Sequence, residues 1–228
     1  MATKGPHERA VRFQAASLVL EGLLGLPPTQ TPVPGVVVCH PHPLYGGDLS
    51  NNVVEAVCAA LVGRGLAALR FNFRGVGQSQ GEFDRGWGEQ DDLRGALAFL
   101  AAQPEADPAR LGVAGYSFGA AVALAVGAGA GRVGALCAIS APLDGPQLPK
   151  PEDWGPKAKL LVVGDADALV PLQALERWAA TLPPPVELRS FEEVDHFWAD
   201  AEEELAETVG EFFARSLGAP SLHSQSSI

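Results

Sequence analysis

A serine at position 117 lies between two glycines, in the pentapeptide Gly-Tyr-Ser-Phe-Gly at residues 115–119. An apolar run at 111–114 precedes it, and small residues with a helical pattern follow at 120–126. G-x-S-x-G between a strand and a helix is the signature of a nucleophile elbow, where the serine occupies a strained backbone conformation in a tight turn. The flanking positions must be small, because larger side chains would collide as strand and helix close. We therefore expect Ser117 to present its hydroxyl as a nucleophile.

A serine hydroxyl needs a neighbouring base to take its proton, and that base needs a carboxylate to orient it. Asp167 and His196 each come just after a predicted strand, as Ser117 does. The chain order serine, aspartate, histidine is the one that accompanies a strand–elbow–helix nucleophile. We expect one end of the sheet to gather the three as a catalytic triad. Asp165 and Asp195 remain alternatives for the carboxylate.

Acyl transfer also needs N–H donors for the developing oxyanion. The first expected donor is the backbone N–H of Phe118, directly after the nucleophile. The second is expected from the loop at 40–48, which reads His-Pro-His-Pro-Leu-Tyr-Gly-Gly-Asp after a β-branched run. His42 is preferred because the prolines on either side of it have no N–H. Leu44 and Tyr45 remain alternatives.

The same loop admits a metal-binding interpretation. His40 and His42, at i and i+2 after a strand, could face one metal ion. However, prolines restrain this backbone, and no other cluster of His, Cys or carboxylates offers an obvious third ligand. An isolated pair of ligands is a weak signal. We therefore expect neither a metal site nor an organic cofactor.

The elements that must position these residues alternate along the chain. Strands are predicted at 10–16, 18–26, 35–39, 66–73, 110–114, 133–140, 159–163 and 186–191. Helices are predicted at 51–61, 89–102, 120–126, 171–181 and 199–217. This alternation predicts an α/β fold with a doubly wound, mostly parallel sheet, led by an antiparallel hairpin at one edge. We expect a single domain over residues 1–217 and a Ser-rich, disordered tail at 218–228.

The composition limits the classes of binding partner and the cellular compartment that we expect for this protein. The formal net charge of −11 argues against nucleic acid and anionic membrane surfaces. The first residues lack the apolar core of a signal peptide, and no run of about 18 apolar residues exists. Cys39, Cys58 and Cys137 lie in apolar segments, which fits buried free thiols in a reducing cytoplasm. We expect a cytoplasmic monomer or homodimer.

With these residues in place, the chain resembles the α/β-hydrolase-fold serine hydrolases, in particular the small, lidless bacterial ones related to dienelactone hydrolase and carboxylesterases. The resemblance implies Ser117 as nucleophile, Asp167 as third member, His196 as base, and esterase-like activity. The loop at 40–43 departs from the family by reading His-Pro-His-Pro in place of the commoner His-Gly. The motifs that carry the resemblance lie at residues 40–47, 71–79, 115–119, 164–167 with 170–171, and 195–197.

The absence of a helical lid is expected from the sequence. Caps in this fold usually follow the strand predicted here at 133–140. Only residues 141–158 separate that strand from the next, and five prolines keep the segment non-helical. Four aromatic residues are expected to line an apolar substrate pocket in the open cleft: Tyr45, Trp154, Phe197 and Trp198.

Together these features predict a serine hydrolase that cleaves carboxylic esters of small or short acyl-chain substrates through an acyl-enzyme. The expected partner is a small-molecule ester. The same triad could serve a lactonase, a thioesterase or a peptidase. A metal-dependent hydrolase centred on His40 and His42, and a non-catalytic binding protein with this fold, are the less favoured alternatives.

Overall fold

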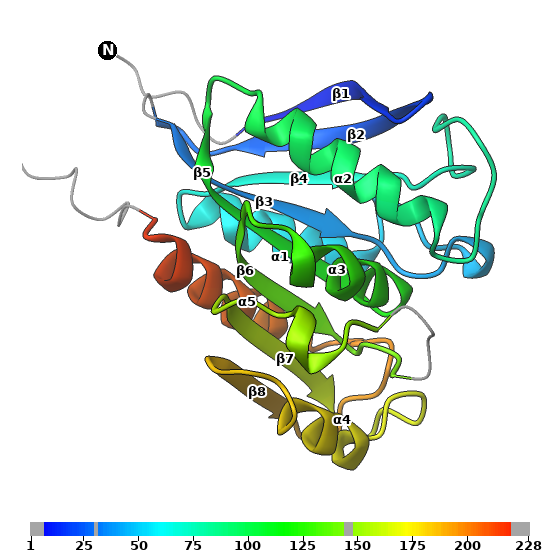
Figure 1. Cartoon of the computed structure of the whole chain (residues 1–228), viewed down its shortest axis with the longest axis vertical. Helices are drawn as coiled ribbons and strands as arrows, with labels where there is room; N and C mark the ends of the chain where they lie inside the picture. The colour runs from blue at the N-terminus through cyan, green and yellow to red at the C-terminus, as the bar shows by residue number, and fades with distance from the viewer. Residues whose placement is uncertain (1–6, 30–31, 144–147, 220–228) are drawn as a thin grey trace, which may run out of the picture.

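The computed structural model describes residues 7–29, 32–143 and 148–219, and its centre is an eight-stranded sheet (Figure 1). The strand order is β1-β2-β4-β3-β5-β6-β7-β8. β1 pairs with β2 and β2 with β4 in antiparallel fashion, and all other pairs are parallel. The predicted doubly wound, mostly parallel sheet with its edge hairpin is confirmed. The strands are β1 (His7–Ala15), β2 (Leu18–Leu26), β3 (Val33–Cys39), β4 (Ala67–Phe71), β5 (Ala106–Tyr116), β6 (Val133–Ile139), β7 (Ala158–Gly164) and β8 (Val186–Phe191).

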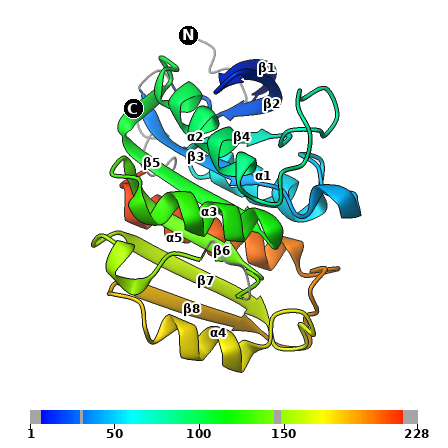
Figure 2. The same ribbon diagram turned by 45° about the vertical axis from the view of Figure 1, so that its right-hand side comes forward.

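Helices cover both faces of this sheet. α1 (Asn52–Gly63) and α5 (Glu202–Leu217) pack on one face, and α2 (Gly88–Ala101), α3 (Phe118–Gly129) and α4 (Leu172–Ala179) pack on the other. Figure 2 shows α3 and α5 on opposite sides of the central strands. The central strand β3 is buried along its whole length, which is why it reads as an uninterrupted apolar run.

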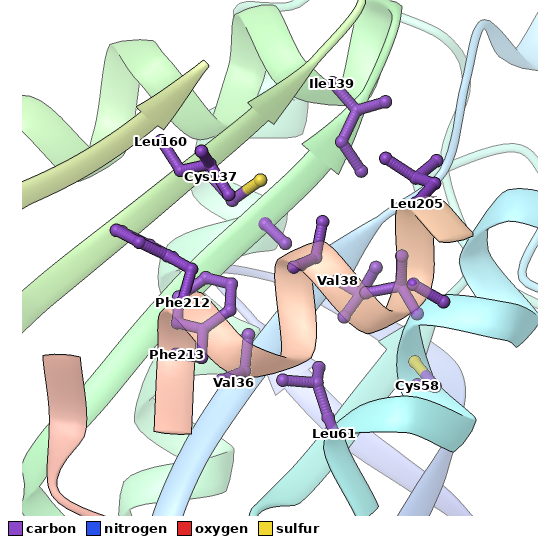
Figure 3. Close-up of a cluster of buried hydrophobic side chains, with 14 of the residues drawn as sticks. Val36, Val38, Cys58, Leu61, Cys137, Ile139, Leu160, Leu205, Phe212 and Phe213 are labelled. Carbon is purple, nitrogen blue, oxygen red and sulfur yellow. The ribbon is translucent and has the colours of Figure 1, made fainter. Parts of the chain in front are cut away.

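The core beneath α1 and α5 explains the positions of two cysteines (Figure 3). Val36 and Val38 of β3 meet Phe212 and Phe213 of α5 there, with Cys58 and Cys137 in the same cluster. All three cysteines of the chain are buried free thiols, as predicted. Burial raises the pKa of Cys58 to about 12, so this thiol stays protonated and behaves as a small apolar side chain.

The last helix begins three residues later than the apolar pattern predicts. α5 starts at Glu202 rather than at residue 199. Trp198 and Asp200 have φ values of 61° and 64°, in the left-handed region, so the backbone before Glu202 cannot be helical. α5 ends at Leu217, and Gly218 caps it with φ of 64°. The predicted disordered tail lies, from residue 220 on, outside the described residues.

The segment between β6 and β7 carries no α-helix over residues 141–143 and 148–157. Its described part holds one short 3-10 turn, Pro151–Asp153. Residues 144–147 of the predicted lid-free segment lie outside the described chain. Among all described residues, no helix is long and apolar enough to cross a membrane.

A buried ion pair anchors the long loop that follows β4. The Asp92 carboxylate on α2 is fully buried and accepts hydrogen bonds from the Arg74 backbone N–H, Nε and Nη2 at 2.8–3.1 Å. Gly88 makes room for this arginine, since a Cβ there would lie 1.8 Å from Arg74 Nη1. The anchored loop places the Phe83 ring 4.9 Å from His42 and 5.6 Å from Phe118. The pair therefore supports one wall of the region beside Ser117.

We predict that Asp92→Ala lowers the free energy of unfolding by about 3–5 kcal/mol, because it leaves the mostly buried Arg74 cation unpaired. The neighbouring Asp91 is the matched control, since its pair with Arg94 is exposed on both sides. Asp91→Ala should cost less than about 1 kcal/mol. Urea unfolding at pH 7 measures both. Equal losses in the two variants would contradict a structural role for the Arg74–Asp92 pair.

Candidate active site

Ser117 occupies the turn between β5 and α3 with φ 53° and ψ −119°, a conformation that a non-glycine residue rarely adopts. A Cβ on Gly115 would lie 2.2 Å from the carbonyl oxygen of Gly119. A Cβ on Gly119 would lie 2.4 Å from the carbonyl oxygen of His40. Strand, helix and the end of β3 thus approach too closely for any side chain at either glycine. This is the strand–elbow–helix geometry that the pentapeptide predicts.

The structure brings Ser117, His196 and Asp167 together from three separate strand ends. His196 Nε2 lies 3.0 Å from Ser117 Oγ, and His196 Nδ1 lies 2.9 Å from Asp167 Oδ2. The two other candidate carboxylates accept backbone N–H groups rather than contacting the His196 ring. Asp165 Oδ1 accepts the Glu193 N–H, and Asp195 Oδ1 accepts the Phe197 N–H, each at 2.8 Å. The carboxylate at the histidine is therefore that of Asp167.

The Asp167 carboxylate is held by several donors at once. Its Oδ1 accepts the N–H groups of Leu169 and Val170, each at 2.9 Å. Burial opposes ionisation of Asp167, but hydrogen bonds from His196, Val170 and Ser140 outweigh it and keep the pKa below its ordinary value. An ionised Asp167 favours the His196 tautomer with the proton on Nδ1, which leaves the Nε2 lone pair facing Ser117.

Tyr116 holds the histidine loop from the nucleophile strand, a role that the sequence did not indicate. Its hydroxyl donates to the backbone oxygen of His196 at 2.6 Å, and the two rings lie 5.7 Å apart. Burial raises the pKa of Tyr116, so the hydroxyl stays a neutral donor. Close backbone packing adds a second restraint, since a Cβ on Gly164 would lie 1.9 Å from the Val194 oxygen. The β7 end and the His196 loop are therefore locked together.

The geometry of the loop after β3 narrows the choice of a second oxyanion donor. Leu44 N–H donates to His42 Nδ1 at 3.2 Å, and Tyr45 N–H donates to the His42 carbonyl at 3.1 Å. Both alternative amides are thus used inside the loop. The N–H groups of His42 and Phe118 form no hydrogen bond with the described part of the chain. These two amides remain the candidates for an oxyanion.

His40 restrains the peptide unit that carries the His42 N–H. The buried His40 ring accepts the Phe73 N–H on Nε2 at 3.1 Å, so its proton sits on Nδ1, which donates to the Pro41 carbonyl at 2.7 Å. That carbonyl and the His42 N–H belong to one planar peptide unit. Orienting the carbonyl therefore orients the amide.

The same hydrogen bonds leave the two loop histidines poorly suited to hold a metal ion. Both ring nitrogens of His40 are engaged, and Nδ1 of His42 accepts the Leu44 N–H. Within residues 7–29, 32–143 and 148–219, no three His, Cys, Asp or Glu side chains gather in a way that could hold a metal. The donor set does not fit the alternative of a metal centre at His40 and His42.

A cavity of about 560 Å³ opens beside Ser117. Tyr45 and Phe197, two of the predicted pocket residues, lie on it together with His42, Phe118, Pro142 and Leu169. Leu44, Tyr45, Leu169 and Phe197 are between 67% and 87% exposed, which is unusual for side chains of this size. The cleft is therefore open to solvent and rimmed by apolar side chains.

The prediction that Trp154 and Trp198 line this pocket is wrong. Trp198 is fully buried in the core, 5.2 Å from the Phe191 ring, and donates its Nε1–H to Ser140 Oγ at 3.1 Å. Its indole is therefore part of the core and not of the cleft lining. Trp154 is 7% exposed and packs over the β7 residue Lys159, in the cluster under α4. Both rings bury large apolar areas that sequence position alone does not reveal.

The sequence was compared with protein families and with known proteins. The chain matches the family described as X-Pro dipeptidyl-peptidase (S15 family) over residues 19–148, a stretch that includes the elbow but not Asp167 or His196. An uncharacterized protein of Rickettsia prowazekii is 40% identical over 116 residues, which are 51% of this chain and 48% of that protein. The chain thus spans about half the length of this curated relative.

Two solved structures match along nearly the whole chain. An α/β serine hydrolase without a lid from Xanthomonas campestris is 33% identical, covers 96% of this chain and 100% of its own, and has a TM-score of 0.82. An α/β serine hydrolase homologue from Coxiella burnetii is 30% identical, with coverage of 92% and 99% and a TM-score of 0.79. The chain belongs to the α/β-hydrolase-fold serine hydrolases, and its residues 19–148 place it in the X-Pro dipeptidyl-peptidase (S15) family.

We predict a pH-dependent stability that originates in His40. Burial lowers the pKa of His40 from 6.5 to about 4. Between these values the unfolded chain binds a proton that the folded chain refuses, so stability present above pH 6.5 is lost as the pH falls. The loss by pH 4 should be about 3 kcal/mol, at 1.36 kcal/mol per pKa unit.

Urea unfolding of the wild type and His40→Gln between pH 7 and pH 4 measures this contribution. The variant should start less stable at pH 7 and lose less stability than the wild type as the pH falls. Parallel curves for the two proteins would show that His40 is not the responsible group.

Proposed function

We propose that this serine hydrolase cleaves carboxylic esters of small or short acyl-chain substrates through an acyl-enzyme on Ser117. The observation that carries the proposal is the hydrogen-bonded chain Ser117–His196–Asp167, which ends at an open, mostly apolar cleft. Serine activated by an oriented histidine is the arrangement that acyl transfer to water requires.

The reaction begins when His196 Nε2 takes the Ser117 proton as Oγ attacks the ester carbonyl. The tetrahedral oxyanion accepts hydrogen bonds from the N–H groups of Phe118 and His42, and Asp167 stabilises the imidazolium. His196 then gives the proton to the leaving alkoxide, and the alcohol departs from the acyl-enzyme. Water, deprotonated by His196, releases the acid and restores Ser117.

The S15 match supports a second candidate, removal of an X-Pro dipeptide from a peptide. Such a substrate carries a free amino terminus, a cation that a desolvating site must pair with a carboxylate. Among the described residues that line the cavity, none is an aspartate or glutamate. The uncharged, apolar lining favours a neutral ester over a dipeptidyl unit.

The same machinery could also open lactones or cleave thioesters, since both present an acyl carbonyl to Ser117. Activity on a panel of 4-nitrophenyl acetate, butyrate and octanoate, a δ-lactone, a butyryl thioester and a Gly-Pro anilide separates these classes. We expect the highest kcat/KM among the short acyl esters. A Gly-Pro anilide that exceeded every ester would replace the proposal with the dipeptidyl-peptidase candidate.

The direct test of the proposed mechanism is covalent labelling with a fluorophosphonate, read by intact mass and peptide mapping. We expect one adduct, on Ser117, that disappears in Ser117→Ala and in His196→Ala. Labelling that persists in His196→Ala at the wild-type rate would contradict an activated serine. A folded wild-type protein that takes no label would remove the triad and leave a non-catalytic binding protein as the better interpretation.

We further predict that Asp167→Asn lowers kcat by about 10³–10⁴-fold, because an amide no longer selects the productive His196 tautomer. Asp165→Asn is the matched control on the same turn, since Asp165 accepts the Glu193 N–H and forms no hydrogen bond with His196 among the described residues. It should keep kcat within about twofold of the wild type. Steady-state kinetics on a short acyl ester decides the matter, and a comparable loss in Asp165→Asn would overturn the assignment of Asp167.

A further inference from the structure

Ser140 occupies a conformation that calls for an explanation. It follows the last residue of β6 and is fully buried, with φ of 45° in the left-handed region. A side chain other than glycine is strained there, and strained, buried polar residues concentrate at functional sites. The residues on either side, Ile139 and Ala141, are also buried, so solvent cannot satisfy the hydroxyl.

The Ser140 hydroxyl joins two groups that belong to the candidate site. Its oxygen accepts the Nε1–H of Trp198 at 3.1 Å, and its hydroxyl is one of the hydrogen-bonding groups that lower the pKa of the Asp167 carboxylate. An indole can only donate and an ionised carboxylate can only accept. The direction is therefore fixed: Trp198 donates to Ser140, and Ser140 donates to Asp167.

These bonds close a ring with the two residues that Ser117 needs. Asp167 is bonded to His196, and Trp198 lies two residues after His196 in the same loop. We propose, on the basis of the proposed function, that Ser140 is a positioning residue whose hydroxyl locks the Asp167 carboxylate to the loop that carries His196. It acts through Asp167 and Trp198 and does not touch substrate, because it is fully buried and lies outside the cavity.

Removal of the Ser140 hydroxyl should make the Asp167 carboxylate less rigidly oriented without changing the cleft. Asp167 now receives donors from His196, Leu169, Val170 and Ser140, which together fill the acceptor sites of a carboxylate. Without Ser140 the carboxylate keeps one unfilled site and can rotate away from His196, and Trp198 loses the acceptor for its buried Nε1–H. The expected consequence is a fall in kcat with little change in KM.

Three variants test the proposal. Ser140→Gly removes the hydroxyl and relieves the positive φ, so it keeps the fold even if Ser140→Ala does not. Trp198→Phe removes only the indole donor to Ser140. Trp154→Phe is the matched control, since Trp154 is also a buried indole but its Nε1 has no hydrogen-bond partner among the described residues. Circular dichroism and thermal unfolding verify that each variant is folded.

We expect Ser140→Gly to lower kcat on a short acyl ester, and the rate of fluorophosphonate labelling, by about 10–100-fold, with KM within about twofold of the wild type. Trp154→Phe should change neither. Trp198→Phe should lower kcat by itself but add little in the Ser140→Gly background, because both changes break the same chain of hydrogen bonds. Fully additive losses, or a kcat for folded Ser140→Gly within twofold of the wild type, would overturn the proposal.

A readout that needs no turnover separates this proposal from the proposed function. The His196 Nδ1 proton, identified by its loss in Asp167→Asn, is followed by proton NMR. We expect its exchange with water to be at least tenfold faster in Ser140→Gly than in the wild type and unchanged in Trp154→Phe. Unchanged exchange in Ser140→Gly would refute the positioning role. Absence of label on wild-type Ser117 would refute the proposed function, whatever the NMR result.

Discussion

Strand β5 and helix α3 meet at Ser117 so closely that no Cβ fits at Gly115 or Gly119. This approach forces Ser117 into the left-handed region and brings its hydroxyl to the carboxyl end of the sheet. It also presses Gly119 against the His40 carbonyl, so the loop after β3 lies beside the elbow. The other candidate groups lie near this elbow because a parallel sheet brings the residues after its strands to one edge.

A second constraint is the cost of burying the Asp167 carboxylate. A buried charge is tolerated only when hydrogen bonds replace its hydration. Here the replacement comes from four directions: the turn after β7, the His196 ring, the strained Ser140 after β6 and, through Ser140, the indole of Trp198. The hydrogen bonds that stabilise the buried Asp167 carboxylate therefore also orient the His196 ring. These contacts join Ser140 after β6, the turn after β7 and the His196 loop after β8.

The cleft beside Ser117 is apolar and open, unlike the buried, hydrogen-bonded groups beneath it. It is open, rimmed by exposed apolar side chains, and supported on one side by Phe83, whose loop the buried Arg74–Asp92 pair anchors. The described lining carries no carboxylate and no lysine or arginine. Such a surface recognises shape and apolar area rather than charge, which accords with small neutral esters. A tightly ordered acid–base chain beneath a permissive cleft fits a hydrolase whose chemistry is specified more narrowly than its substrate.

The sequence by itself determined the sheet, its edge hairpin, the missing lid, the elbow and the triad candidates Ser117, Asp167 and His196. These follow from local patterns: apolar runs, proline and glycine positions, and polar residues just after strands. Only the tertiary structure decided between Asp167 and the alternatives Asp165 and Asp195. It also showed that the N–H of His42, unlike those of Leu44 and Tyr45, has no hydrogen-bond acceptor within the described part of the chain. It also moved Trp154 and Trp198 from the pocket to the core and revealed Tyr116 and Ser140. Hydrogen bonds between segments some 30 to 80 residues apart, such as Tyr116 to His196 and Trp198 to Ser140, depend on how the strands pack and leave no periodic trace in the chain.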